Sequence, residues 1–157
     1  MDRLARVLHG DELKVAFAFL LTMPGAPFIY YGDEIGLRYV ENLVSVEGGY
    51  NRTGSRSPMQ WNHEVNFGFS NASPEKLYIP TDDKPNSPTV EDQMKDPNSL
   101  YYEVKKLIAL RREHSALLSD GNIEFVSDGA DGSPLAYIRS SADEKILVVV
   151  NPADREA

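Results

Sequence analysis

The middle of the chain, residues 33–96, has no sustained hydrophobic period, and this limits the possible folds more than any other feature. Glycine, proline, asparagine and serine recur through it. An irregular connection of this length inside a compact domain is usually functional or disordered. Its centre is "YNRTGSRSPMQW" (50–61), which ends on the only tryptophan of the chain. Because a solvated linker needs neither two arginines nor a tryptophan, we interpret this region as functional.

Ordered elements are predicted before this region. Residues 11–23 form a predicted helix that begins with Asp11 as N-cap and ends at Pro24-Gly25. The second half of this helix is apolar on nearly every side, so it should be buried almost all round. The next run, "PFIYYG" (27–32), is β-branched and aromatic, and it predicts a strand.

Order is predicted to resume after the irregular region. Asp96 is a suitable cap, and Pro97 suits the first position of a helix. Apolar spacing gives this helix a buried face that includes Arg111, while Arg112 lies on the polar side. Three short strands then follow at residues 122–127, 134–140 and 145–150. The turn-rich segments between them are typical of an antiparallel meander.

Composition excludes several classes of function. The net charge of -8 argues against a nucleic-acid partner, and the absence of cysteine excludes disulfides and thiolate metal sites. The longest apolar run is too short to span a bilayer, and no signal peptide precedes it. We therefore expect a soluble chain without a membrane partner, with a cytoplasmic location favoured.

No catalytic residue, metal ligand or cofactor site is predicted from the residues alone. The adjacent acidic pairs are Asp33-Glu34, Asp82-Asp83 and Glu91-Asp92. Neighbours in an extended chain point to opposite faces, so such a pair is badly arranged to act together on one bond. The three histidines lack ligand spacing, and no glycine-rich phosphate loop is present.

The arginine cluster allows two interpretations. In the first, Arg–carboxylate pairs pin a structural loop, with Met59 and Trp61 packed beneath it. In the second, the cluster is a sugar site, in which an arginine fork binds hydroxyls or fixes a carboxylate and aromatic rings supply stacking. The residues alone leave both open.

Three motifs, in the right order and spacing, resemble those of glycoside hydrolase family 13, the α-amylase family. "MPGAPFIYYGDEIGL" (23–37) resembles the segment around the eighth barrel strand. "RSPMQWN" (56–62) with "GFS" (68–70) is similar to a signature of the oligo-1,6-glucosidase and α-glucosidase branch. "VEDQMKDPNSLYYEVKKLIALRREHSAL" (90–117) resembles the pattern that follows in that branch.

This resemblance implies a fold of class α/β plus β. Residues 1–117 would be the end of a (β/α)8 catalytic barrel, with 33–96 as its long eighth βα loop near the sugar pocket. Residues 118–157 would begin an incomplete antiparallel β-sandwich. The family's three catalytic carboxylates would lie before residue 1, so the chain is expected to be a C-terminal fragment that is inactive alone and self-associates.

The resemblance also implies the substrate and its binding residues. Arg52 matches an arginine that pairs with an aspartate of the sugar pocket, which makes Arg52 and Arg56 the substrate-binding candidates. Arg56, Met59 and Trp61 are also expected to hold the shape of the loop. The family often has an Arg-Asp pair where this chain has Arg52-Thr53. The implied partner is an α-linked oligosaccharide, and no cofactor is implied.

Two other interpretations of the function of the chain remain open. One is a non-catalytic relative, such as the family-13-like ectodomains of amino-acid transporter heavy subunits. The other is a free-standing carbohydrate-binding or structural domain, against which three strands and a single tryptophan argue. The sequence preceding residue 1 would separate the first reading from an enzyme.

Overall fold

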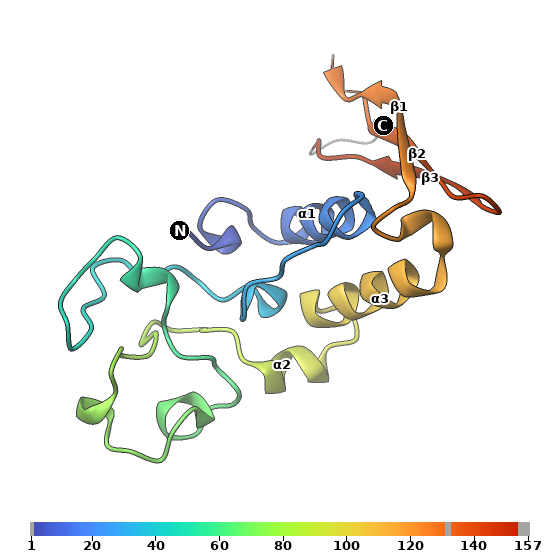
Figure 1. Cartoon of the computed structure of the whole chain (residues 1–157). Coiled ribbons are helices and arrows are strands. Elements are labelled where there is room, and N and C mark those ends of the chain that lie inside the picture. Colours follow the sequence, from blue (N-terminus) through green and yellow to red (C-terminus); the bar gives the residue numbers. More distant parts are fainter. Residues whose placement is uncertain (1, 131–132, 154–157) are drawn as a thin grey trace. The chain divides into compact units, whose positions relative to one another are not determined.

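The computed structural model describes residues 2–130 and 133–153. The chain divides into two compact units, Met1–His9 with Ile29–Tyr102 and Gly10–Phe28 with Glu103–Ala157. We call these the first and the second unit. The helices and strands occur along the chain in the order α1, α2, α3, β1, β2, β3 (Figure 1). This division into units does not test the predicted domain boundary between residues 117 and 118. That boundary stays a prediction.

The sheet of the second unit is an antiparallel meander, as the sequence predicts. It contains β1 (Asn122–Asp128), β2 (Leu135–Ser140) and β3 (Lys145–Val150), in that spatial order. The register between β1 and β2 shifts between Phe125 and Ser127, which leaves a bulge at that point. The place of this sheet in a sandwich stays a prediction.

Helix α1 (Asp11–Thr22) forms where the sequence predicts it, but two details differ. Gly10 (φ 53°), not Asp11, precedes the helix as N-cap, and no side chain caps it. The buried residues Leu13, Phe17 and Leu21 form one stripe at a spacing of four, while Phe19 is 38% exposed. Burial almost all round is therefore wrong for this chain, because the described residues cover only one stripe of the helix.

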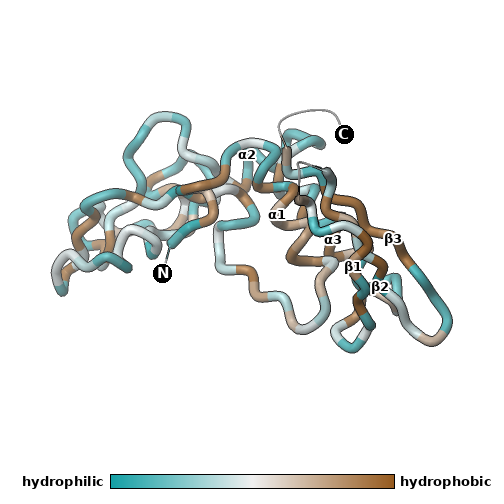
Figure 2. The backbone as a smooth tube through the Cα atoms, turned by 90° about the horizontal axis from the view of Figure 1, so that it is seen from above, coloured by the Kyte–Doolittle hydropathy of each residue, from teal (hydrophilic) through white to brown (hydrophobic). Residues whose placement is uncertain are grey.

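The core of the second unit contains two completely buried polar side chains, Tyr137 and Arg139. The Tyr137 hydroxyl lies 2.5 Å from the Thr22 hydroxyl at the end of α1. Arg139 donates to the carbonyls of Thr22, Leu118, Gly121 and Asn122. Hydrophobic residues dominate α1 and β3 (Figure 2). Arg139 therefore supplies donors that the surrounding apolar side chains lack.

Helix α3 (Leu100–Glu113) begins later than Pro97, the predicted first position. Asn98 donates its backbone N–H to the Asp96 side chain, so the predicted cap forms a turn before the helix instead. Arg111, on the predicted buried face, donates to the carbonyls of Leu21, Met23 and Gly25. These bonds satisfy carbonyls that the end of α1 leaves unpaired.

No strand forms at residues 27–32, where the sequence predicts one. A strand is defined by a ladder of hydrogen bonds, and no other described segment pairs with this run. The run is apolar, but an apolar run forms a strand only when neighbouring strands pair with it.

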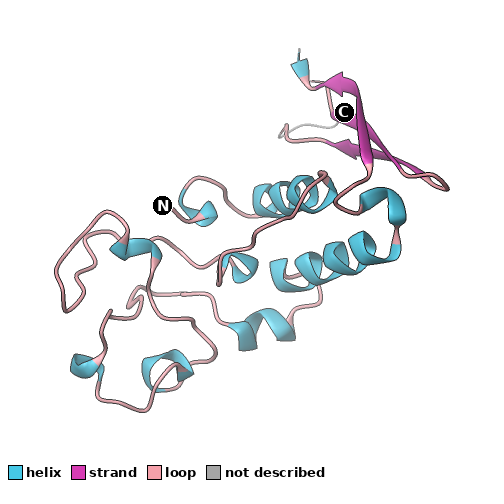
Figure 3. Cartoon of the chain, in the orientation of Figure 1, coloured by secondary structure: helices cyan, strands magenta, loops and turns pink. Residues whose placement is uncertain are grey.

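The first unit is built mostly from loops and short helical turns (Figure 3). Among the described residues, the one α-helix that lies wholly within this unit is α2 (Val90–Lys95), in a region where the sequence predicts no helix. The 3-10 turns of this unit are Leu4–Arg6, Asp33–Ile35, Thr53–Ser55, Val65–Gly68 and Pro74–Lys76. Within the described ranges, every helix is too short or too polar to cross a membrane.

Candidate functional site

A single 3-10 turn, Thr53–Ser55, separates the two candidate arginines. Its three residues are buried, whereas Arg52 and Arg56 on either side of it are exposed. The Ser55 hydroxyl donates to the Arg52 carbonyl at 2.9 Å. The Tyr50 backbone N–H donates to the Thr53 hydroxyl at 3.1 Å. This buried turn therefore holds the backbone of both arginines and leaves their side chains accessible.

Gly54 lets this turn lie directly against the backbone of a neighbouring segment. Its carbonyl accepts the Val40 N–H at 2.9 Å. A Cβ at this position would lie 2.3 Å from the Val40 carbonyl oxygen and 2.6 Å from the Tyr39 ring. The absence of a side chain is thus a steric requirement.

The "PMQW" part of the segment is held by the beginning of α2. Gln60 is completely buried, and its side-chain amide donates to the Pro88 carbonyl at 2.6 Å. The Val90 N–H donates to the Gln60 carbonyl at 3.0 Å, and the Glu91 N–H donates to the Trp61 carbonyl at 2.9 Å. The first N–H groups of a helix have no partner within the helix. The carbonyls of the loop therefore accept the hydrogen bonds that the first residues of α2 donate.

Side chains reinforce the same junction. Thr89 is the N-cap of α2 and accepts the Asp92 N–H at 3.1 Å. The hydrogen bond from Thr89 and the contact with His63, 2.6 Å from the carboxylate, hold the pKa of Asp92 below its ordinary value. His63 follows the tryptophan closely, so this pair also restrains the end of the segment.

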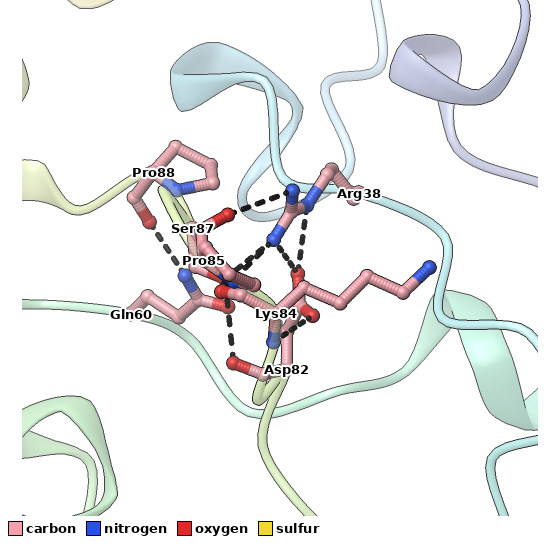
Figure 4. A network of polar contacts seen from close by, with 7 residues as sticks. All are labelled: Arg38, Gln60, Asp82, Lys84, Pro85, Ser87 and Pro88. Atoms are coloured by element: carbon pink, nitrogen blue, oxygen red, sulfur yellow. Dashed lines mark hydrogen bonds and ion pairs between the residues drawn. The ribbon is translucent and has the colours of Figure 1, made fainter.

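An ion pair between the partly exposed Arg38 and the buried Asp82 organises the return of the chain toward α2 (Figure 4). The Arg38 Nε donates to the Asp82 carboxylate at 2.8 Å, and Arg38 also donates to the Ser87 hydroxyl at 2.6 Å. The other Asp82 oxygen accepts the Lys84 N–H at 3.2 Å. Asp82 is 1% exposed, so its partners are needed to stabilise the buried charge.

Asp33 of the first acidic pair also has a structural partner. Its carboxylate lies 3.1 Å from the Arg3 guanidinium, which stacks over the rings of Tyr30 and Tyr31. Burial raises the pKa of Asp33, and the hydrogen bond from Arg3 opposes that shift. Burial also raises the pKa of Tyr31 to about 12, and the Tyr31 hydroxyl donates to the Ser57 carbonyl at 3.0 Å.

Two cavities flank the 50–61 segment. A polar cavity of about 640 Å³ includes Arg6, Glu41, Tyr50 and Asn51 in its lining. An apolar cavity of about 420 Å³ is lined mainly by aromatic and other apolar side chains. Its lining includes Tyr31, Glu34, Arg56, Trp61, Phe69 and Tyr78.

The two predicted arginines lie differently with respect to these cavities. The Arg52 guanidinium lies 4.8 Å from the centre of the Tyr50 ring, beside the polar cavity. Arg56 lines the apolar cavity together with Trp61. The structure therefore brings both arginines to one loop, but their role in binding sugar stays a prediction.

Sequence reasoning missed three residues of the region. Arg38 and Gln60 act through contacts distant in sequence, which hydrophobic spacing does not reveal. Glu34 was assigned to an acidic pair, but it lines the apolar cavity. No group of three or more histidine, aspartate or glutamate side chains in the described ranges could hold a metal ion.

Comparison with known proteins gives one consistent family. Residues 1–121 match the alpha-amylase catalytic domain. The chain is 37% identical over 161 residues to the trehalose synthase/amylase of Mycobacterium tuberculosis, covering 98% of this chain and 26% of that protein. It is 34% identical over 176 residues to the glucan 1,6-alpha-glucosidase of Streptococcus pneumoniae, covering 94% of this chain and 32% of that protein.

Solved structures agree with the sequence matches. The trehalose-6-phosphate hydrolase of Bacillus licheniformis has a TM-score of 0.77 and 28% identity, covering 97% of this chain and 32% of that one. The chain thus spans between about a quarter and a third of the length of these relatives. Both the family model and the relatives give the same answer, and the chain belongs to the alpha-amylase family of glycoside hydrolases, glycoside hydrolase family 13.

Proposed function

We propose that this chain is the C-terminal part of a retaining α-glucosidase that acts on short α-linked oligosaccharides. Membership of the alpha-amylase family carries the proposal, and similarity to a glucan 1,6-alpha-glucosidase supports the substrate class. A retaining enzyme needs two carboxyl groups about 5–5.5 Å apart at the scissile bond. In this proposal those groups come from a part of the parent protein that precedes this chain.

The contribution of the chain is substrate binding. Asp33 and Asp82 are paired with arginines, so these carboxylates already have structural tasks. Arg52, by contrast, is exposed on a loop whose backbone is fixed. We propose that Arg52 pairs with an aspartate of the parent's sugar pocket and thereby orients the terminal sugar. Arg56 would contact the substrate from the same loop.

A second candidate is glucosyl transfer that yields trehalose. The observation in its favour is the 37% identity to a trehalose synthase/amylase, above the 34% identity to the glucosidase. Incubating the parent protein with maltose and with isomaltose separates the two. Release of glucose indicates hydrolysis, whereas accumulation of trehalose indicates the synthase reaction.

The test of the binding role compares two arginines in the parent enzyme. Arg52→Ala removes one partner of a proposed buried charge pair, a change that typically costs about 2–5 kcal/mol. We expect kcat/KM to fall at least about 30-fold, which corresponds to 2 kcal/mol. Arg112→Ala is the control, because Arg112 is exposed on α3. Equal effects of the two substitutions would contradict the assignment of Arg52.

A further inference from the structure

The side chain of Arg3 is completely buried in the first unit, yet only part of its guanidinium is bonded. The Nη1 atom donates to the Tyr31 carbonyl and to the Asp33 carboxylate. The Nε and Nη2 atoms are buried and have no hydrogen-bond partner among the described residues. These two atoms lie along one edge of the planar guanidinium. Because a buried donor without a partner is costly, we expect an acceptor along this edge.

The other two buried arginines show how a buried guanidinium is paired in this chain. Arg111 donates to three backbone carbonyls, and Arg139 donates to four. In the part of the chain that the structure describes, neither arginine has a nitrogen that is both buried and unpaired. The unpaired edge of Arg3 is therefore an exception that needs its own explanation.

Two tyrosines hold the guanidinium of Arg3 in place. Its central carbon lies 4.4 Å from the centre of the Tyr30 ring and 4.6 Å from the centre of the Tyr31 ring. The two ring centres are only 4.7 Å apart, so both rings lie on the same side of the guanidinium. An aromatic face attracts a cation but accepts no strong hydrogen bond from it. The rings thus orient the guanidinium and leave the donors of its edge to another partner.

We propose that the Nε–Nη2 edge of Arg3 binds a carboxylate. The two N–H donors of this edge are parallel, and they match the two oxygens of a carboxylate in a bidentate pair. Asp33 contacts Nη1 instead, so the guanidinium lies between Asp33 and the second negative group. A phosphate fits less well, because its remaining charged oxygens need further donors, which the faces of Tyr30 and Tyr31 lack.

The carboxylate has two possible sources. One is a free carboxylate anion, which reaches Arg3 when the surrounding residues open locally. The other is an aspartate or glutamate of the parent protein, since the chain spans only between about a quarter and a third of the length of its relatives. From either source, the bound group fixes Arg3 and, through the ring contact, Tyr31, whose hydroxyl donates to the Ser57 carbonyl next to Arg56. The site therefore supports the loop that carries Arg56.

Acetate tests the site in the chain itself. Thermal unfolding of the full chain, followed by Trp61 fluorescence, is compared in sodium acetate, sodium phosphate and sodium chloride of equal ionic strength at neutral pH. A ligand that binds only the folded chain raises the melting temperature. We expect acetate to raise it by about 2–4 °C relative to chloride. Phosphate should give a smaller rise than acetate, because its additional oxygens remain unpaired at this site.

A matched pair of variants assigns the effect to Arg3. Arg3→Lys keeps the positive charge but removes the planar pair of donors, so the rise with acetate should be lost. Arg6→Lys is the control, because the Arg6 side chain is 41% exposed and pairs with Asp2 and Glu41, and the rise should persist there. If Arg3→Lys does not fold, the Nε–H proton resonance of Arg3 in the unsubstituted chain tests the same contact. Acetate should move that resonance downfield, since a charge-assisted hydrogen bond forms.

The parent protein distinguishes the two sources of the carboxylate. If one of its own side chains pairs with the edge, acetate should stabilise the parent no more than chloride does. Arg3→Lys should then lower the melting temperature more in the parent than in the isolated chain, measured against Arg6→Lys in each. If the carboxylate is a free anion, acetate should stabilise the parent and the isolated chain alike.

Three results would overturn the proposal. Equal melting temperatures of the isolated chain in acetate and in chloride would indicate that a buried water pairs the edge of Arg3. An equal rise in Arg3→Lys would place the effect of acetate elsewhere, and a larger rise with phosphate would contradict a carboxylate. None of these measurements involves catalysis, so their outcome is independent of the activity proposed for the parent protein.

Discussion

At the scale of single residues, the position of Arg52 and Arg56 depends on the small residues between them. Thr53, Gly54 and Ser55 are buried and bonded, and they place two large cations at the surface. The sequence showed that the arginines are four residues apart, and it suggested a fixed loop. It could not show that Gly54 contacts Val40, because that contact joins segments distant in the chain.

Replacing Gly54 should therefore disturb both arginines. The Cβ of Gly54→Ala would lie 2.3 Å from the Val40 carbonyl oxygen. Overpacking of this kind typically lowers the free energy of unfolding by about 1–3 kcal/mol. Gly49→Ala is the control, since its nearest neighbour would lie 3.4 Å away. Thermal unfolding followed by Trp61 fluorescence measures both variants, and equal stability of the two would contradict this steric explanation.

At the scale of elements, prediction succeeded where the pattern is local. The strands at 122–127, 134–140 and 145–150 have β-branched residues and intervening turns, and all three form close to those bounds. The run 27–32 has a similar pattern but has no pairing partner among the described strands. Helix α2 was missed because its six residues are stabilised by the carbonyls of Gln60 and Trp61, not by an apolar period.

The turn between β2 and β3 is fastened by Glu144. His114 lies 2.5 Å from its carboxylate, and the Ala116 N–H donates to it at 3.0 Å. The hydrogen bond with His114, which has the largest effect, and the one from the Ala116 N–H hold the pKa of Glu144 below its ordinary 4.5. A carboxyl group whose pKa is lowered by folding contributes stability above the unfolded pKa, and the contribution is lost as the pH falls through the folded pKa.

Glu144→Gln should consequently lower the melting temperature at neutral pH. The difference from the unsubstituted chain should be present above pH 4.5 and should shrink as the pH falls below that value. Glu124→Gln, at an exposed position of β1, serves as the control for loss of one negative charge. Melting temperatures between pH 2 and pH 7 provide the measurement. A difference that persists at the lowest pH would exclude an electrostatic origin.

At the scale of the whole molecule, the chain leaves much apolar surface uncovered. Phe28 is 89% exposed, and Leu147 and Val149, which share one face of β3, are 60% and 57% exposed. Strands β1 and β3 are the outer strands of their sheet, so each has an edge that no described strand pairs. Such edges and faces favour association with other chains.

We therefore expect the isolated chain to form a dimer or a larger assembly. Strand pairing or exchange of helices between copies would cover the exposed surface. Light scattering on freshly purified protein measures the mass directly. A single species of 17.5 kDa that unfolds cooperatively would show that the chain is self-sufficient, contrary to this expectation.

We also expect the isolated chain not to hydrolyse α-glucosides. The double displacement needs a pair of suitably spaced carboxyl groups, which the proposed function places elsewhere in the parent protein. Incubation with p-nitrophenyl α-glucoside and with isomaltose, after stringent removal of host enzymes, tests this. Activity that co-purifies with the folded chain would mean that its own carboxylates perform the chemistry.

The hydrogen bonds between "PMQW" and α2 have a consequence for variation among relatives. Because Gln60 and Trp61 bond directly to Val90 and Glu91, the residues between them form an excursion with a closed neck. Closed surface loops tolerate changes of length better than the elements that anchor them. Phe69 and Tyr78 lie within this excursion, whereas Arg52 and Arg56 lie before it. We therefore expect variation in length to concentrate in the parts of this excursion that lie away from Asp82 and Ser87, which Arg38 holds, while Arg52 and Arg56 keep their positions.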